Sequence, residues 1–307
     1  MRVKLYRNGQ ALVQLAAHDV GTGAYTIAAQ ITARELGLAV ESVRVEMGDS
    51  ALPPSPISGG SNAAASVSSV IMKACQAIRA KLFTAATTQG SLVRQPASKL
   101  ELKEGKIVSP DGKSEPLAAV FDATGGGVIE EYAEWFGPGQ SAKDVAGLYN
   151  GKIAITGGAK GEKLMYAFGA EFVEVRINAR TREIRVPRLV GAFAAGHIVN
   201  PRTARSQLMG GLIWGIGSAL HEQTEIDVRH ARYVNTDIAE YLVPINADAP
   251  QIEVILVPEV DTFVNPAGVK GLGELGNVGT AAAITSAVYH ATGKRVRDLP
   301  IRIEKLL

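Results

Sequence analysis

The sequence contains one cysteine, Cys75, among its 307 residues. A single cysteine excludes a disulfide framework, and it excludes an iron–sulfur cluster held by this chain alone. Cys75 lies within a helical pattern at residues 70–83. We therefore expect a buried, inert thiol rather than a nucleophile at this position.

Long apolar runs and an excess of charge of one sign are also missing. No run approaches the roughly 20 apolar residues that a membrane helix needs, and the first residues lack a signal-peptide pattern. The net charge is only +2, with both signs interspersed. We expect no membrane span and no nucleic-acid partner, because nucleic-acid binding requires a basic face.

Aromatic residues are few, at 6%, whereas glycine is frequent, at 33 residues. The hydrophobic fraction of 46% is enough for a sizeable core in one large domain or two modest ones. This composition fits a protein whose loops approach a bulky ligand through their backbone. Glycine-rich turns in an ordinary protein would give the same composition.

One carboxylate, Glu274, lies inside the glycine run Gly-Leu-Gly-Glu-Leu-Gly at residues 271–276. Residues 278–292 follow with the apolar spacing of a helix. A glycine-rich turn at a helix N-terminus exposes backbone N–H groups to an anionic ligand. Glu274 is therefore either a structural cap at this helix or a residue that acts on a bound ligand.

The same glycines match the dinucleotide fingerprint G-x-G-x-x-G, but the surroundings exclude a Rossmann domain. That fingerprint follows a strand directly and continues into a βαβ unit. Here the strand candidate at 252–258 is separated from the glycines by a loop at 259–270, and only residues 299–307 follow the helix. A nicotinamide site is thus excluded.

Strand and helix patterns predict an α+β chain. We expect a hairpin at 168–190 with its turn at 178–181, a second hairpin at 100–108, and an irregular excursion at 123–160. Further strands are predicted at 3–15 and 42–46, and helices at 25–36, from 63 onward and at 201–220. Glycines along the helix at 201–220 would admit either a neighbouring helix or a cofactor.

Loops rich in Gly, Ser and Asn precede helices at four places, beginning near residues 21, 59, 191 and 271. Four such loops could converge on one extended anionic ligand. Helix starts also attract these residues in any protein, so the spacing alone leaves both interpretations open.

In sequence order, these segments resemble the C-terminal half of the molybdenum-cofactor-binding subunit of the xanthine dehydrogenase and aldehyde oxidase family. Residues 269–275 resemble its terminal Gly-Glu motif, 21–23 its Gly-Gln-Gly loop, and 61–66 its Ala-Ala-Ser helix start. Residues 196–201, with Gln207 and the Gly-Gly pair at 210–211, resemble its Asn-Pro loop and the helix after it. Residues 191–218 and 295–307 are most similar to the bacterial periplasmic aldehyde oxidoreductase branch.

The resemblance implies two layered α/β subdomains, at 1–160 and 161–307, with the cofactor loops between them and the catalytic glutamate on the second. It implies that Glu274 is the catalytic base, and burial in an apolar pocket would raise its pKa toward working pH. It implies a molybdopterin cytosine dinucleotide held by the following residues: Gly21, Thr22, Gly23, Ala64, Ala65, His197, Ile198, Val199, Asn200, Pro201, Arg202, Thr203, Gln207, Lys270, Gly271, Leu272 and Gly273.

No protein ligand to the metal is expected, because in this family the pterin dithiolene holds the molybdenum. His197 also has no second ligand at metal-binding spacing. From the residues alone, Gln207 could be a solvent-facing amide, whereas the resemblance implies that it donates or accepts a hydrogen bond with the cofactor. Thr22 departs from the family's usual glutamine, so the contact of that side-chain amide is lost, whereas backbone contacts at Gly21 and Gly23 need no particular side chain.

The implied activity is oxidation of aldehydes, aromatic ones in particular, to carboxylic acids with water as the oxygen source. The cofactor carries out the redox step, and the protein supplies orientation and a base. The alternatives are hydroxylation of an N-heterocycle, or an inactive fragment or assembly module.

The family's subunit has an N-terminal half that this chain lacks, so we expect that half as a partner. The resemblance also implies an iron–sulfur subunit and an FAD subunit in a heterotrimer. Export to the periplasm would depend on a partner's signal, and a cytoplasmic location is the alternative.

Overall fold

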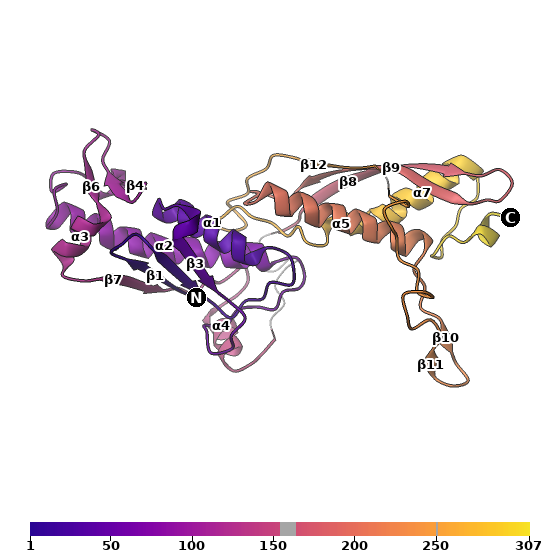
Figure 1. Cartoon of the computed structure of the whole chain (residues 1–307), viewed down its shortest axis with the longest axis horizontal. Coiled ribbons are helices and arrows are strands. Elements are labelled where there is room, and N and C mark those ends of the chain that lie inside the picture. Colours follow the sequence, from indigo (N-terminus) through magenta and orange to yellow (C-terminus); the bar gives the residue numbers. More distant parts are fainter. Residues whose placement is uncertain (154–163, 250) are drawn as a thin grey trace. The chain divides into compact units, whose positions relative to one another are not determined.

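The computed structural model describes residues 1–153, 164–249 and 251–307, and it confirms a mixed α+β chain (Figure 1). The chain forms two compact units, which are described separately. Unit 1 comprises Met1–Met165, His197–Asn200 and Val260–Gly271; unit 2 comprises Tyr166–Gly196, Pro201–Glu259 and Leu272–Leu307. The assignment of residues 1–160 and 161–307 to two functional subdomains stays a prediction.

Unit 1 is built on a four-stranded sheet in the order β3-β2-β1-β7, with helices α1 and α2 packed against it. Val3 and Leu5 of β1 are fully buried, as the alternation of its side chains requires. The bounds are β1 Arg2–Tyr6, β2 Ala11–Gln14, α1 Ala24–Leu36, η1 Val40–Ser42, β3 Val43–Glu46, α2 Ala63–Thr88 and β7 Val128–Tyr132.

The 26-residue helix α2 is the centre of the unit 1 core. Ile71, Cys75, Ile78 and Leu82 are completely buried along it. The prediction of an inert thiol at Cys75 is confirmed in its burial, and this burial raises the thiol pKa well above its ordinary value.

A smaller sheet, in the order β4-β5-β6, lies beside helix α3 in unit 1 and contains the predicted hairpin at 100–108. Gly37, which ends α1 with φ +62°, packs directly against the backbone of Leu102 and Lys103 in β4. The bounds are η2 Ala97–Lys99, β4 Glu101–Lys103, β5 Lys106–Val108, β6 Ser114–Pro116 and α3 Leu117–Thr124.

The irregular excursion predicted at 123–160 is wrong over much of its described length. Strand β7 lies there and pairs antiparallel with β1, and helix α4 (Ala142–Tyr149) follows. The partner of β7 is more than 120 residues away in sequence, so its pairing leaves no local periodicity. Helix α4 carries a capping box between Ser141 and Asp144, a local signal that the glycines around it obscured.

Unit 2 contains a three-stranded sheet in the order β12-β9-β8, with β8 and β9 antiparallel and β12 parallel to β9. This confirms the predicted hairpin at 168–190. Helices α5 and α7 pack on the sheet around a core that includes Leu189, Phe193, Leu212 and Ile284. The bounds are β8 Phe168–Ile177, β9 Ile184–Ala194, α5 Pro201–Leu220, β12 Ile252–Leu256, α6 Leu275–Val278, α7 Thr280–Thr292 and η3 Ile303–Leu306.

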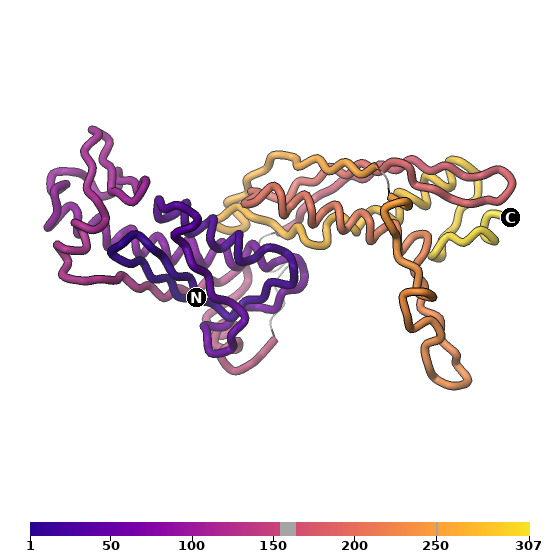
Figure 2. The backbone as a smooth tube through the Cα atoms, viewed as in Figure 1, coloured from indigo at the N-terminus to yellow at the C-terminus, as the bar shows by residue number. Residues whose placement is uncertain are grey.

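Between α5 and β12 the chain leaves the packed part of unit 2 as a long arm (Figure 2). The arm carries the short strands β10 (Ile226–Asp227) and β11 (Arg232–Tyr233). Its apolar side chains are largely exposed, Val228 to 85%. None of the helices in the described ranges has the length and hydropathy needed to cross a bilayer.

Candidate functional site

The loop at 19–25 of unit 1 is organised around a carboxylate that the sequence analysis did not single out. One oxygen of Asp19 accepts hydrogen bonds from the backbone N–H groups of Gly21 and Gly23, at 2.9 and 3.1 Å, and the other accepts one from Tyr25 at 3.2 Å. Gly21 and Gly23 have φ values of 99° and 83°, which only glycine adopts readily. The turn therefore wraps its N–H groups around Asp19 at the start of α1.

The pKa of Asp19 reflects this arrangement. Partial burial alone would raise it, but the N–H groups of Tyr25, Gly23, Gly21 and Thr22 together lower it below its ordinary value. The N–H groups of Gly21 and Gly23 were expected to be open to the cofactor. Both N–H groups donate to Asp19 instead. A cofactor at this turn would therefore have to contact Thr22 or the loop carbonyls.

A second cluster in unit 1 joins the start of α2 to the segment at 260–271. A side chain at Gly271 would come within 3.1 Å of the Ser61 carbonyl oxygen, so this glycine packs against the residue before the helix. Asn62 occupies the N-cap position of α2, but its side chain makes no capping hydrogen bond, and its Nδ2 donates to the Gly59 carbonyl. The first turn of α2 contains no acidic residue, and its Ala64 and Ala65 are half-buried.

Residues 265–270 form a tightly bonded loop that meets the short segment His197–Asn200. Asn265 bonds the backbone of Val269 through both ends of its amide, and the His197 N–H donates to the Gly268 carbonyl at 2.7 Å. Lys270, predicted to contact the cofactor, is only 8% exposed and lies 3.1 Å from Asp261. Burial alone would raise the pKa of Asp261, but Lys270 lowers it below its ordinary value.

The other residues of the predicted Asn-Pro loop in unit 1, Ile198, Val199 and Asn200, are half-buried, and Val199 packs against the unit 1 core. His197 contacts the neighbouring loop through its backbone N–H. Within residues 1–153, 164–249 and 251–307, no group of three or more His, Cys, Asp or Glu side chains is arranged to hold a metal ion.

In unit 2, helix α5 carries the remaining predicted residues. Pro201 and Arg202 are exposed and Thr203 is half-buried in its first turn. Gln207 is half-buried, and its Nε2 donates to the Gly273 carbonyl at 2.9 Å. The solvent-facing alternative for Gln207 is therefore wrong. This amide fixes the glycine loop that carries Glu274, across 66 positions of sequence.

The glycine face of α5 receives neighbouring helices. A side chain at Gly211 would come within 2.9 Å of the Gly276 backbone, and one at Gly215 would collide with Thr280 at the start of α7. In reverse, a side chain at Gly276 would collide with the backbone of Leu208. Of the two alternatives left open by the sequence, Gly211 and Gly215 thus serve helix packing.

Glu274 lies at the N-cap position of α6, yet its side chain makes no capping hydrogen bond. The carboxylate is exposed within unit 2, so the apolar surroundings expected for it are not supplied by the described part of that unit. The Glu274 side chain therefore does not stabilise the N-terminus of α6 by a capping hydrogen bond. Two contacts fix the backbone of the loop around Glu274: the Gln207 amide donates to the Gly273 carbonyl, and Gly276 packs against the backbone of Leu208.

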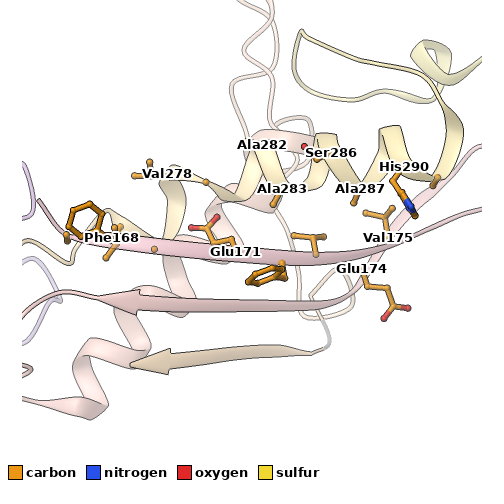
Figure 3. A pocket seen from close by; sticks show the side chains of 17 residues that line it. Phe168, Glu171, Glu174, Val175, Val278, Ala282, Ala283, Ser286, Ala287 and His290 are labelled. Atoms are coloured by element: carbon orange, nitrogen blue, oxygen red, sulfur yellow. The ribbon is translucent and has the colours of Figure 1, made fainter. Parts of the chain in front are cut away.

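Unit 2 also contains a groove between β8 and α7 that the sequence analysis did not anticipate (Figure 3). Its volume is about 930 Å³, and its lining includes Phe168, Glu171, Phe172, Ala283 and His290. No sequence signal could have located it, because it depends on how β8 pairs in the sheet and on the packing of a helix more than 100 residues later.

Comparisons with known proteins agree with these motifs. A sequence model of the molybdopterin cofactor-binding domain family matches residues 1–250. The chain is 38% identical over its whole length to the aldehyde oxidoreductase molybdenum-binding subunit PaoC of Escherichia coli K12, of which it covers 38%. It is 28% identical over 99% of its length to the putative xanthine dehydrogenase molybdenum-binding subunit XdhA of the same organism, again covering 38%.

Solved structures share the fold. The chain matches the aldehyde oxidoreductase of Desulfovibrio desulfuricans with a TM-score of 0.71 at 25% identity, over 99% of its own length and 29% of that chain. It matches quinoline 2-oxidoreductase of Pseudomonas putida 86 with a TM-score of 0.78 at 22% identity, over 99% of its own length and 37% of that chain. The chain therefore spans well under half the length of these relatives.

Proposed function

The chain belongs to the molybdopterin cofactor-binding domain family, and from this premise we propose that it is part of the molybdenum subunit of an aldehyde oxidoreductase, with Glu274 as the catalytic base. The observation that carries the proposal is the construction of the Glu274 loop. Its carboxylate is exposed and caps no helix, while Gln207 and Gly276 fix the backbone on both sides of it. These contacts hold the backbone of the loop in place, which supports a catalytic role for the exposed carboxylate.

The residues of unit 1 fit an anionic cofactor at the start of α2. The N-terminus of this 26-residue helix carries the positive end of the helix dipole. Its first turn contains no acidic residue and no side-chain cap, and the small side chains of Ala64 and Ala65 lie there. We assign the phosphates of the cofactor to this helix end. His197–Asn200 and Lys270–Gly271 would hold the pterin from the neighbouring loop, and Thr22 would contribute its hydroxyl.

The unit 2 residues Pro201, Arg202, Thr203, Leu272 and Gly273 complete the proposed cofactor set, with Gln207 orienting the Gly273 backbone. The cofactor, when bound, supplies the two-electron oxidation. The role of the chain is to orient it, and a carboxylate oxygen of Glu274 accepts the proton released as water is incorporated. The whole activity requires the remaining length of the subunit, since the chain spans 38% of PaoC.

The test is Glu274→Gln in the complete assembled enzyme. We expect kcat to fall by about 10²–10⁴-fold or more, because a general-base contribution is lost, while molybdenum content stays normal. The exposed Glu304 of η3 is a matched control, and Glu304→Gln should change neither quantity. A Glu274→Gln enzyme that lost its molybdenum would instead give Glu274 a structural role.

Aldehydes are favoured as substrates because PaoC is named as an aldehyde oxidoreductase subunit and shares 38% identity with the chain, whereas the putative xanthine dehydrogenase subunit XdhA shares 28%. A panel of aromatic aldehydes and N-heterocycles, assayed with a dye acceptor, separates the two classes. Turnover confined to N-heterocycles would replace the aldehyde assignment. No turnover with either class, despite full cofactor occupancy, would favour an inactive assembly module.

We further propose the cytosine dinucleotide form of the cofactor, with iron–sulfur and FAD subunits as electron-transfer partners and a periplasmic complex. Acid hydrolysis of the purified complex should release CMP in a one-to-one ratio to molybdenum. Co-purification and cell fractionation test the partners and the compartment, with a cytoplasmic complex as the alternative.

A further inference from the structure

Strand β8 is an edge strand of the unit 2 sheet. Over its ten residues it pairs with β9 on one side, and in the described part of the chain no strand pairs with the other side. A long edge with unpaired N–H and C=O groups is a template for another strand. Native proteins usually cover or interrupt such an edge, so its exposure requires an explanation.

The groove follows this edge. Its lining includes Phe168, Phe172 and Glu174, and also Glu171, Val173 and Val175. The two sets alternate along the strand and so point to opposite faces of the sheet. A groove lined by both sets runs along the edge of β8, between the strand and α7.

The lining of the groove is apolar and incompletely filled. Phe172 is 66% exposed although it lies in the middle of a strand. The side of α7 that lines the groove presents small side chains, Ala282, Ala283, Ser286 and Ala287, followed by His290 (Figure 3). The exposed Phe172 ring on one face of β8 and the small α7 side chains beside the other face leave space on both faces, which apolar side chains of another segment would fill.

Glu171 lies in the groove between Phe168 and Glu174, with its carboxylate directed toward the start of α7 (Figure 3). Its Oε2 is buried and makes no hydrogen bond within the described residues. Burial raises the pKa of this carboxyl, and the nearby Thr280 hydroxyl and Gly279 N–H offset only part of that rise. A half-satisfied buried carboxylate is costly, and a hydrogen-bond donor or a cation would relieve it.

We propose that this groove docks an extended segment from the part of the molybdenum subunit that lies outside this chain. The segment adds a strand to the β8 edge. Its alternate side chains pack beside Phe172 on one face and against Ala283 on the other, and it brings a donor or a cation to Glu171. This inference rests on the proposed function, since the occupant is the remainder of that subunit.

The size of the relatives favours this occupant over a second copy of the chain. The chain covers 38% of PaoC and 37% of the quinoline 2-oxidoreductase chain, so in both proteins more than half of the polypeptide lies outside the matched region. The charges in the groove agree, because its ionisable lining consists of Glu171, Glu174 and His290, which favours a basic segment.

The experiment uses this chain co-expressed with the polypeptide that completes the subunit. Hydrogen exchange of the β8 amides should slow by at least about tenfold on assembly, because new ladder hydrogen bonds protect them. Phe172→Asp should weaken assembly by at least about tenfold, and Glu171→Lys should weaken it as well, by placing a cation opposite the partner's cation. Val228→Asp, at a more exposed apolar position on the arm, is the matched control and should change assembly little.

Equal exchange of the β8 amides in the free and assembled chain would overturn the proposal. So would Phe172→Asp and Val228→Asp variants that assemble equally well. Self-association of the chain that Phe172→Asp abolishes would also overturn it, by assigning the groove to a second copy. Hydrogen exchange and assembly are measured without enzyme turnover. If the β8 amides are protected in a complex that lacks aldehyde activity, the proposed function is contradicted but the docking site is still supported.

Discussion

Asp19 in unit 1 and Glu171 in unit 2 are both carboxylates placed at the N-terminus of a helix, and their pKa values shift in opposite directions. Asp19 accepts N–H groups from the turn that leads into α1, and its pKa is lowered. Glu171 reaches the start of α7 from a strand, remains half-satisfied, and has a raised pKa. Proximity to a helix dipole therefore does not decide the ionisation of a carboxylate by itself.

The two pKa values shift in opposite directions because the two carboxylates lose water in different ways and receive their hydrogen bonds from different parts of the chain. Asp19 and its donors lie within seven consecutive residues, so forming the turn automatically satisfies the carboxylate. Glu171 is brought against α7 by tertiary packing, which removes water from the carboxylate without supplying enough donors. The first arrangement is complete within this chain, and the second calls for a further partner.

Breaking the satisfied carboxylate should have the largest effect. Asp19→Ala removes the hydrogen bonds that hold the turn at 21–25, and we expect it to destabilise the start of α1 by about 1–2 kcal/mol at pH 7. Local unfolding free energies from hydrogen exchange of the α1 amides provide the measurement. A loss confined to a few tenths of a kcal/mol would mean that the glycine turn holds its shape without Asp19.

Lowering the pH should reduce the local stability of α1 by an amount between the effects of the Asp19 and Glu171 substitutions. The pKa of Asp19 is below its ordinary value of 3.8 in the folded state, so its contribution is present above pH 3.8 and is lost as the pH falls through the folded pKa. The local stability of α1 should therefore fall below pH 4, and Asp19→Asn should remove much of this dependence. An unchanged acid profile in Asp19→Asn would assign the acid sensitivity to other carboxylates.

Neutralising the half-satisfied carboxylate should have the smallest effect, and of the opposite sign. The raised pKa of Glu171 means that the folded state binds a proton more readily than the unfolded state, so stability decreases as the pH rises from 4.5 through the folded pKa. Glu171→Gln should then leave the α7 amides equally stable or more stable at pH 7, by up to about 0.5–1 kcal/mol. A clear destabilisation in the unassembled chain would show that Thr280 and Gly279 already satisfy the carboxylate.

The same distinction explains what the sequence could predict. Local patterns predicted both ends of α5, the start of α2 and the β8–β9 hairpin, because the signals for these elements lie within the segments themselves. The Asp19 turn could have been predicted as well, since an aspartate two positions before a Gly-x-Gly turn is a common acceptor for its N–H groups. Our expectation of open N–H groups at Gly21 and Gly23 ignored that acceptor.

Features that depend on distant segments were missed. Strand β7 needs β1, the Gln207 amide needs the Gly273 carbonyl, and the β8 groove needs α7. None of these pairings leaves a periodic trace in the residues involved. The roles of Glu274 and of the cofactor loops stay predictions, supported by family membership and by the way Gln207 and Gly276 fix the Glu274 loop.

The glycine face of α5 has a consequence for the order in which unit 2 is made. Glycines at 211 and 215 lower the helicity of α5 on its own, and the contacts that offset this loss come from Gly276 and Thr280, more than 60 residues later. During synthesis α5 therefore emerges from the ribosome well before the residues that stabilise it. Unit 2 can therefore complete its folding only after residue 280 has been synthesised. Until then the apolar side chains of α5 remain exposed, which is the condition under which chaperones bind nascent chains.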